Sequence, residues 1–348
     1  MSVFRLFRLS IRFAAWVTPQ VKEWHRKRNL NLTEAERNMA AHNWVEAEQY
    51  LTLTLAEPRH ASKRRFDLIL QLVQAQCRQG KFAQAEQTTE MAFDLAAKCH
   101  DQSMHLRVLV ALVDVQLDQK KYAEAERTIR EIETLEATQP VPDRARLALC
   151  SSKLGTVLLN TGRTGEAFGA FQQATNLSEQ AFGPNHEQTA HSLAHLGMLS
   201  RHHGDHAGAQ SCLRRALDIH RVTTGPDSNE TTQALYHLAA SLEESGDFDG
   251  AVSEYERVLR LKERQVGGNR QEATDVQVRL AALYVKSGRI GAARELLMHA
   301  IGVLEGKGGP KLAEALEIFA VVEDHMGHPV EAKQWRERAA ETVAQSPR

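Results

Sequence analysis

The sequence is poor in cysteine and proline and carries almost no net charge. Its four cysteines, Cys77, Cys99, Cys150 and Cys212, lie far apart and form no CxxC pair, so a disulfide framework is not indicated and we expect a reducing compartment. Only nine of the 348 residues are proline, while 42% are hydrophobic and 25% charged, a profile typical of a soluble, helix-rich protein. A net charge of −1 gives no overall signature of nucleic-acid binding.

Long apolar runs and catalytic motifs are also missing. No apolar run approaches the roughly 20 residues that span a bilayer, and Arg5, Arg8 and Arg12 interrupt the region where a secretory signal would be apolar. There is no GxSxG, no phosphate-binding P-loop and no GxGxxG placed after a strand. We therefore expect no enzyme activity, no cofactor and a cytoplasmic location.

An internal repeat of 42 residues is the firmest feature of the sequence. Its central turn is marked by Gly162, Gly204, Gly246 and Gly288. Five residues later come Ala167, Ala209, Ala251 and Ala293. Upstream, the leucines Leu154, Leu196, Leu238 and Leu280 precede the small residues Gly155, Gly197, Ala239 and Ala281. Further rows are Phe171, Leu213, Tyr255 and Leu297, then Leu177, Ile219, Leu261 and Val303, and the connecting glycines Gly183, Gly225, Gly267 and Gly309.

Each repeat has the pattern of an antiparallel pair of helices. Apolar residues recur at helical spacing within a repeat, small residues allow close helix approach, and the central glycine ends the first helix with a positive φ. One pair cannot bury its apolar face alone, so neighbouring pairs are expected to stack. Less regular signals before and after this region bring the total to about eight pairs, and residues 139–143, with Pro140 and Pro142, are expected to form a loop.

These residues resemble the tetratricopeptide repeat family. The 42-residue step and the linkers Phe182-Gly183-Pro184-Asn185-His186 and Thr224-Gly225-Pro226-Asp227-Ser228 are similar to the kinesin-light-chain-like variant of that repeat. The resemblance implies an all-α, right-handed α-solenoid whose concave groove holds peptides or protein segments. We divide the chain into a basic segment 1–28, degenerate repeats 29–137, and regular repeats with a C-terminal cap 144–343, continuous with the preceding array.

A stripe on the first helix of each repeat holds the candidate binding residues. Equal positions in stacked repeats become adjacent, so each row of the stripe is expected to form a ladder. One row is basic or histidine throughout: Lys153, His195, His237 and Arg279. Neighbouring rows add His191, Asn160, His202 and Lys286.

The basic row favours an acidic partner. Lysine and arginine donate charge-assisted hydrogen bonds to carboxylates or phosphates, and histidines gain charge as the pH falls. In the resembled family this position is often an asparagine that holds the ligand backbone, and the basic residues here depart from that pattern. The alternative interpretation is that the stripe is only the solvated face of amphipathic helices.

The sequence contains sixteen histidines, a high number. Two of them, His191 and His195, are spaced four residues apart, a spacing that can bind one metal ion on a helix. Two ligands without a convergent third fall short of a site, and the HExxH pattern is absent, so we expect no metal.

Residues 1–28 lie outside the repeat. They contain seven Lys and Arg residues against the single acid Glu23. Drawn as a helix, the segment is amphipathic, with candidate membrane contacts at Phe4, Arg5, Phe7, Arg8, Ile11 and Arg12. It is interpreted as a peripheral membrane anchor, as a cap on the first repeat, or as a targeting peptide.

The sequence thus predicts a protein- or peptide-binding scaffold with no nucleic-acid partner. The alternatives are a sensory module that binds a small peptide or anion, and an assembly factor peripheral to a membrane.

Overall fold

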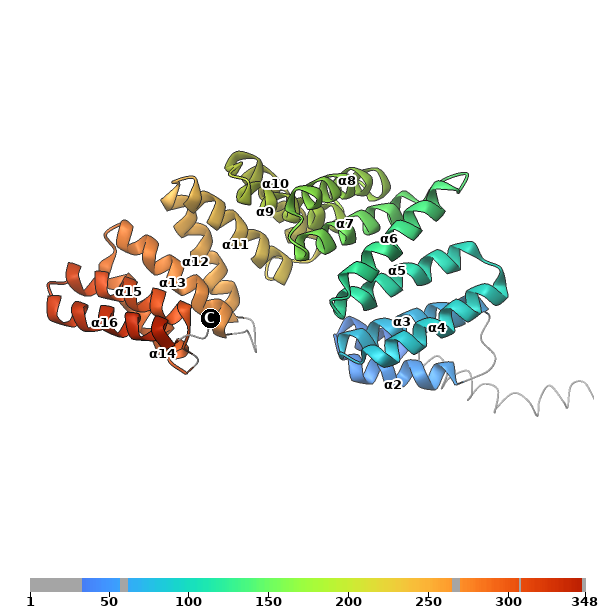
Figure 1. The fold of residues 1–348 in the computed structure, drawn as a ribbon, viewed down its shortest axis with the longest axis horizontal. Coiled ribbons are helices and arrows are strands. Elements are labelled where there is room, and N and C mark those ends of the chain that lie inside the picture. Colours follow the sequence, from blue (N-terminus) through green and yellow to red (C-terminus); the bar gives the residue numbers. More distant parts are fainter. Residues whose placement is uncertain (1–32, 57–61, 265–269, 307, 346–348) are drawn as a thin grey trace, which may run out of the picture. The chain divides into compact units, whose positions relative to one another are not determined.

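The computed structural model describes residues 33–56, 62–264, 270–306 and 308–345 (Figure 1). The chain divides into two compact units, Met1–Arg163 and Thr164–Arg348, here called the N-terminal and C-terminal units. Every regular element in the described residues is a helix.

The N-terminal unit begins, in its described part, with helical residues 33–40. Its other helices are α2 (Trp44–Leu55), α3 (Ser62–Arg78), α4 (Phe82–Cys99), α5 (Gln102–Asp118), α6 (Tyr122–Ala137) and α7 (Arg144–Asn160). The expected loop at residues 139–143 is present between α6 and α7. The buried carboxylate of Glu136 accepts a hydrogen bond from the backbone N–H of Asp143 at 2.8 Å and pairs with Arg146, so the loop is tied to both helices.

The C-terminal unit contains nine helices in the described residues. They are α8 (Thr164–Phe182), α9 (Glu187–His202), α10 (His206–Thr223), α11 (Asn229–Glu244), α12 (Phe248–Arg264), α13 (Arg270–Lys286), α14 (Ile290–Leu304), α15 (Pro310–His325) and α16 (Pro329–Gln345). Together with the N-terminal unit this makes sixteen helices over the described part of the chain. The predicted all-α array of helix pairs is confirmed.

The turn inside each repeat is built by the first glycine row. Gly162, Gly204, Gly246 and Gly288 have φ between 74° and 87°, as predicted from their position. After α9, the N–H of Asp205 bonds the carbonyl of Ser200 at 2.9 Å, the six-to-one bond that closes a helix ending in a left-handed residue. The Asp205 side chain then accepts from the N–H of Gly208 at 2.9 Å and caps the start of α10.

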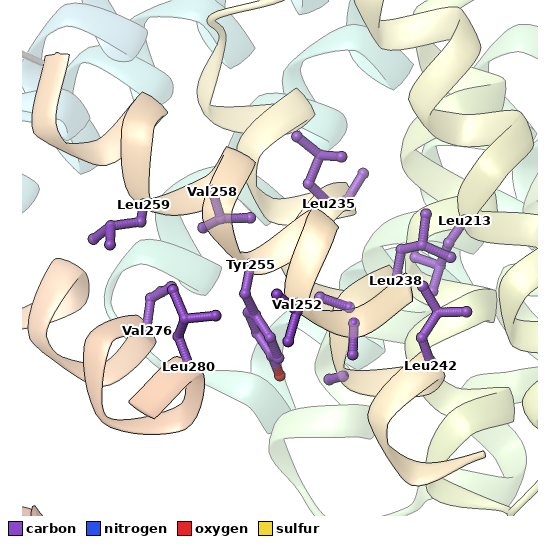
Figure 2. Packing of buried hydrophobic residues seen from close by; sticks show 14 of the residues in the cluster. Leu213, Leu235, Leu238, Leu242, Val252, Tyr255, Val258, Leu259, Val276 and Leu280 are labelled. Atoms are coloured by element: carbon purple, nitrogen blue, oxygen red, sulfur yellow. The ribbon is translucent and has the colours of Figure 1, made fainter. Parts of the chain in front are cut away.

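Within each unit, helices pack against their neighbours in the chain, and first helices also pack against each other. Within the C-terminal unit, α9 contacts α10 and α11, and α13 contacts α14 and α15. The core between α10, α11, α12 and α13 is filled by the repeat's apolar rows, including Leu213, Leu238, Tyr255 and Leu280 (Figure 2). Small residues bring helices close, because a Cβ on Gly197 would lie 2.5 Å from Cγ of Leu213.

Candidate partner-binding surface

The eight predicted binding residues all lie on first helices. Lys153 and Asn160 belong to α7 in the N-terminal unit. The other six belong to the C-terminal unit: His191, His195 and His202 on α9, His237 on α11, and Arg279 and Lys286 on α13. A ladder running through both units remains a prediction.

In the N-terminal unit the predicted cation already has an acidic partner. The Nζ of Lys153 pairs with Oδ1 of Asp114, which projects from the neighbouring first helix α5. The amide of Asn160 donates to the carbonyl of Thr156, one turn earlier in its own helix, at 2.8 Å. Both side chains are therefore engaged inside the unit.

His195 is held by an aromatic ring of the preceding second helix. Its imidazole stacks on Phe171 of α8, with ring centroids 4.5 Å apart and planes 11° from parallel. Burial lowers the pKa of His195 to about 4, and the neighbouring His191 contributes to this shift. The ring is consequently neutral at physiological pH.

His237 is neutral for a related reason. Burial lowers its pKa to about 4, and the charges of Arg201, His195 and His202 lower it further. The helices α9 and α11 pack against each other, and these α9 residues are close enough to act on the pKa of His237. Within the described residues, the Nδ1 of His237 is buried without a hydrogen-bond partner.

Arg279 of α13 forms an ion pair with a residue of α11. Its guanidinium lies 3.5 Å from Oε2 of Glu243. The same oxygen accepts a hydrogen bond from the hydroxyl of Tyr255 at 3.1 Å. Beside this pair, Arg201 of α9 forms an ion pair with Glu244. The face therefore carries alternating positive and negative groups rather than an unbroken row of cations.

The remaining predicted residues lie at the edges of this face. His202 is exposed, and its Nε2 is 3.5 Å from Arg201. Lys286 is exposed and lies over the ring of Phe248, 4.9 Å from the centroid. His191 approaches Oε1 of Glu187 at 3.4 Å, and its ring packs edge-on against His220 at 5.0 Å.

Sequence reasoning did not single out Arg201 and Glu243. The signal available for them was the helical register, because both lie in the last turns of α9 and α11 and follow the leucine row by five residues. It also did not single out a cavity of about 540 Å³ between α12, α13 and α14. That cavity is lined by three carboxylates, Glu256, Glu263 and Glu295, together with Arg260, Tyr284 and His299.

The membrane hypothesis concerns residues 1–28, and the metal hypothesis concerns His191 and His195 of α9. The candidate membrane contacts Phe4, Arg5, Phe7, Arg8, Ile11 and Arg12 lie outside the described residues, so they stay a prediction. Among the described residues, none of the helices has the length and apolarity to cross a bilayer. In the same residues no three potential ligands gather as a metal site would require, and His195 stacks on Phe171 rather than pairing with His191.

Comparisons with known proteins agree with the repeat. A family model described as Tetratricopeptide repeat matches residues 143–221, 193–264 and 230–306. No curated protein sequence matches the chain.

Solved structures with a TM-score above 0.5 share the fold at low identity. A signal transduction ATPase with a tetratricopeptide repeat sensor, PH0952 from Pyrococcus horikoshii, is 13% identical, with a TM-score of 0.69 over 91% of this chain and 47% of that chain. The APC/C Cut9–Hcn1 hetero-tetramer is 14% identical, with a TM-score of 0.55 over 97% of this chain and 57% of that one. A Podosopora anserina protein of the kinesin light chain type, with nearly identical TPR-like repeats, is 18% identical, with a TM-score of 0.49 over 57% of this chain and 95% of that one.

The family match covers the part of the chain where the 42-residue step is most regular. The helix pairs, the left-handed glycine turns and the stacked first helices of that part are those expected of the family. Residues 143–306 are therefore tetratricopeptide repeats.

Proposed function

We propose that the chain is a protein- or peptide-binding scaffold, and that a partner segment lies along the first helices of the C-terminal unit. One observation carries this proposal. The packing of α9 on α11 gathers His195, His202, Arg201 and His237 on one face, with polar side chains of both helices at its surface. Stacked repeats of this kind offer an extended surface rather than an enclosed catalytic site.

A preference for an acidic partner is expected to be weak. His195 and His237 are neutral near pH 7, and Arg279 already lies beside Glu243. A partner carboxylate that binds Arg279 would take the place of Glu243. The gain in binding free energy is then only the difference between two similar ion pairs. Lys286 has no ion pair within the described part of the unit and is the best-placed cation for an acidic side chain.

The two neutral imidazoles suit a different kind of contact. A neutral histidine has one N–H donor and one acceptor nitrogen, and its ring stacks on flat groups. Such groups match the backbone and the aromatic side chains of an extended peptide. We therefore expect partner recognition to depend more on ring contacts and hydrogen bonds than on net charge.

The proposal is tested by partner capture followed by direct binding. The full chain is used as bait in an extract of its source cell, and each captured protein is purified and measured against single variants. His202→Glu and Lys286→Glu place a negative charge at the two edges of the face. Arg214→Glu, on the exposed surface of α10, makes a matched change of charge elsewhere in the same unit.

Support requires a partner whose affinity falls about tenfold in His202→Glu or Lys286→Glu and is unchanged in Arg214→Glu. A partner that binds all three variants equally would exclude the first-helix face as the binding surface. If no captured protein binds the purified chain directly, the scaffold proposal itself fails.

A further inference from the structure

A second cavity, of about 210 Å³, lies at the junction between two repeats of the C-terminal unit. Four of its eight lining residues are arginines, and we call it the arginine pocket. It is lined by Arg221 at the end of α10, Pro226 and Asp227 of the linker, Leu235 of α11, and Arg257, Arg260, Leu261 and Arg264 of α12. The three α12 arginines follow one another at spacings of three and four, so they share one face of the helix.

The pocket lining contains one carboxylate, Asp227, against four arginines, and the other acids that accompany these arginines lie outside it. Arg257 bonds Glu254 at 2.6 Å, one turn back in the same helix. Arg260 is 3.7 Å from Glu256, and Arg221 is 3.8 Å from Asp218, distances too long for hydrogen bonds.

The arginines therefore keep donors for a ligand. Arg264 forms no ion pair with the other described residues of the chain. Each guanidinium carries five N–H donors, so most donors around the pocket are left unsatisfied by protein acids. Arg260 is also 55% exposed, which leaves the pocket open to a ligand from solvent.

The preceding junction of the same unit pairs the corresponding arginine with an acid. One repeat earlier, Arg215 occupies the position of Arg257, and Glu179 occupies the position of Arg221. These two residues form an ion pair at 2.7 Å. In the arginine pocket this acid is replaced by a fourth cation, and Asn185 of the earlier junction is replaced by Asp227, so the lining carries four arginines against one carboxylate.

A purely structural role accounts for only part of this arrangement. Arg221 and Arg264 lie in the last turns of α10 and α12, where cations interact favourably with the helix dipole. Arg257 and Arg260 lie in earlier turns and gain little from that effect, which is confined to the final turn. Their convergence with the other two arginines on one cavity needs a different reason.

We propose that the arginine pocket binds a phosphoryl group. A phosphate monoester carries close to two negative charges and three acceptor oxygens at pH 7, and arginine forks pair with these oxygens in a bidentate manner. The buried Leu235 and the apolar carbons of Pro226 and Leu261 form a floor suited to the carbon chain that carries the phosphate. Half of the lining residues belong to α12 and none belongs to the predicted stripe on the first helices, so this inference does not depend on the proposed partner face.

Binding is measured on the full chain by titration calorimetry at constant ionic strength, because guanidinium–anion contacts are screened by salt. The probes are inorganic phosphate, a short capped peptide with one phosphoserine, and acetate as a carboxylate control. The pocket variant is Arg260→Gln/Arg264→Gln, which removes two partly or fully exposed side chains. Arg214→Gln removes the same kind of charge from α10 outside the pocket, and circular dichroism melting confirms that each variant is folded.

We expect phosphate or the phosphopeptide to bind the unmodified chain and Arg214→Gln with equal affinity. Its affinity for the pocket variant should be at least about tenfold lower. Tighter binding of the phosphopeptide than of inorganic phosphate identifies a phosphorylated protein segment as the source of the group, while the reverse order identifies a free phosphate. The inference is overturned if acetate binds as well as both phosphate probes, if neither phosphate probe binds, or if a folded pocket variant binds as tightly as Arg214→Gln.

Discussion

Replacing Gly197 by alanine tests how closely the two helices of a repeat approach. The added Cβ would lie 2.5 Å from Cγ of Leu213 and 3.1 Å from the carbonyl oxygen of Ala209, both on α10. Carbon atoms in ordinary contact are about 3.5–4.0 Å apart. Leu213 is completely buried, so its side chain has no solvent to move into. The helices α9 and α10 must therefore separate, or the core around Leu213 must repack.

The expected effect is a net loss of stability. Overpacking of a core by one methyl group destabilises by about 1–3 kcal/mol. Alanine is better than glycine inside a helix by about 0.5–1 kcal/mol, which offsets part of that loss. We expect Gly197→Ala to lower the free energy of unfolding by roughly 1–2 kcal/mol.

The assay is urea denaturation followed by circular dichroism, with Gly169→Ala as the matched control. Gly169 lies inside α8, and a Cβ there meets no atom within 4 Å. The control should stabilise the chain by up to about 1 kcal/mol, from helix propensity alone. The close-packing argument is refuted if Gly197→Ala stabilises the chain as much as Gly169→Ala does.

Two further predictions concern backbone strain and pH. Lys120 has φ of 60° at a turn where the later repeats use glycine, so Lys120→Gly should raise the melting temperature by relieving about 1 kcal/mol of strain, and an unchanged or lower value would contradict this. His195 and His237 have pKa values of about 4 in the folded chain against an ordinary 6.5, so the unfolded state binds more protons between these values. Stability should thus be complete above pH 6.5 and fall towards pH 4, by up to about 3 kcal/mol per histidine. The double variant His195→Gln/His237→Gln should flatten the fall in urea midpoint between about pH 7 and pH 5, and an unaltered slope would refute the assignment.

Much of the fold could be predicted because the repeat encodes it locally. Glycine at the central turn, apolar residues at helical spacing and small residues beside the leucine row each specify structure within one helix pair. The row Phe171, Leu213, Tyr255 and Leu297 shows how closely this holds, since all four side chains are fully buried. Internal periodicity therefore predicted the helix pairs and the adjacency of the stripes on α9 and α11.

The charge of the candidate surface could not be predicted in the same way. The repeat register places His195 beside His237, but their neutrality depends on how deeply each ring is buried, and for His195 on the stacking of Phe171. The pairing of Arg279 with Glu243 likewise depends on side-chain directions across two helices. Burial and ion pairing depend on how the helices pack. The sequence of a row gives only the charge that each side chain would carry in water.

The arginine pocket shows a sequence signal of another kind. Positions that face the core stay apolar from repeat to repeat, because each must fill space between stacked helices. Against that constant background, the surface row Glu179, Arg221 and Glu263 changes sign once and changes back. The sign change removes the acid that pairs with Arg215 one repeat earlier and puts a cation beside Arg257. Corresponding positions of the other repeats therefore serve as a reference for each surface residue. A change of charge at one junction that packing does not require points to ligand binding at that junction.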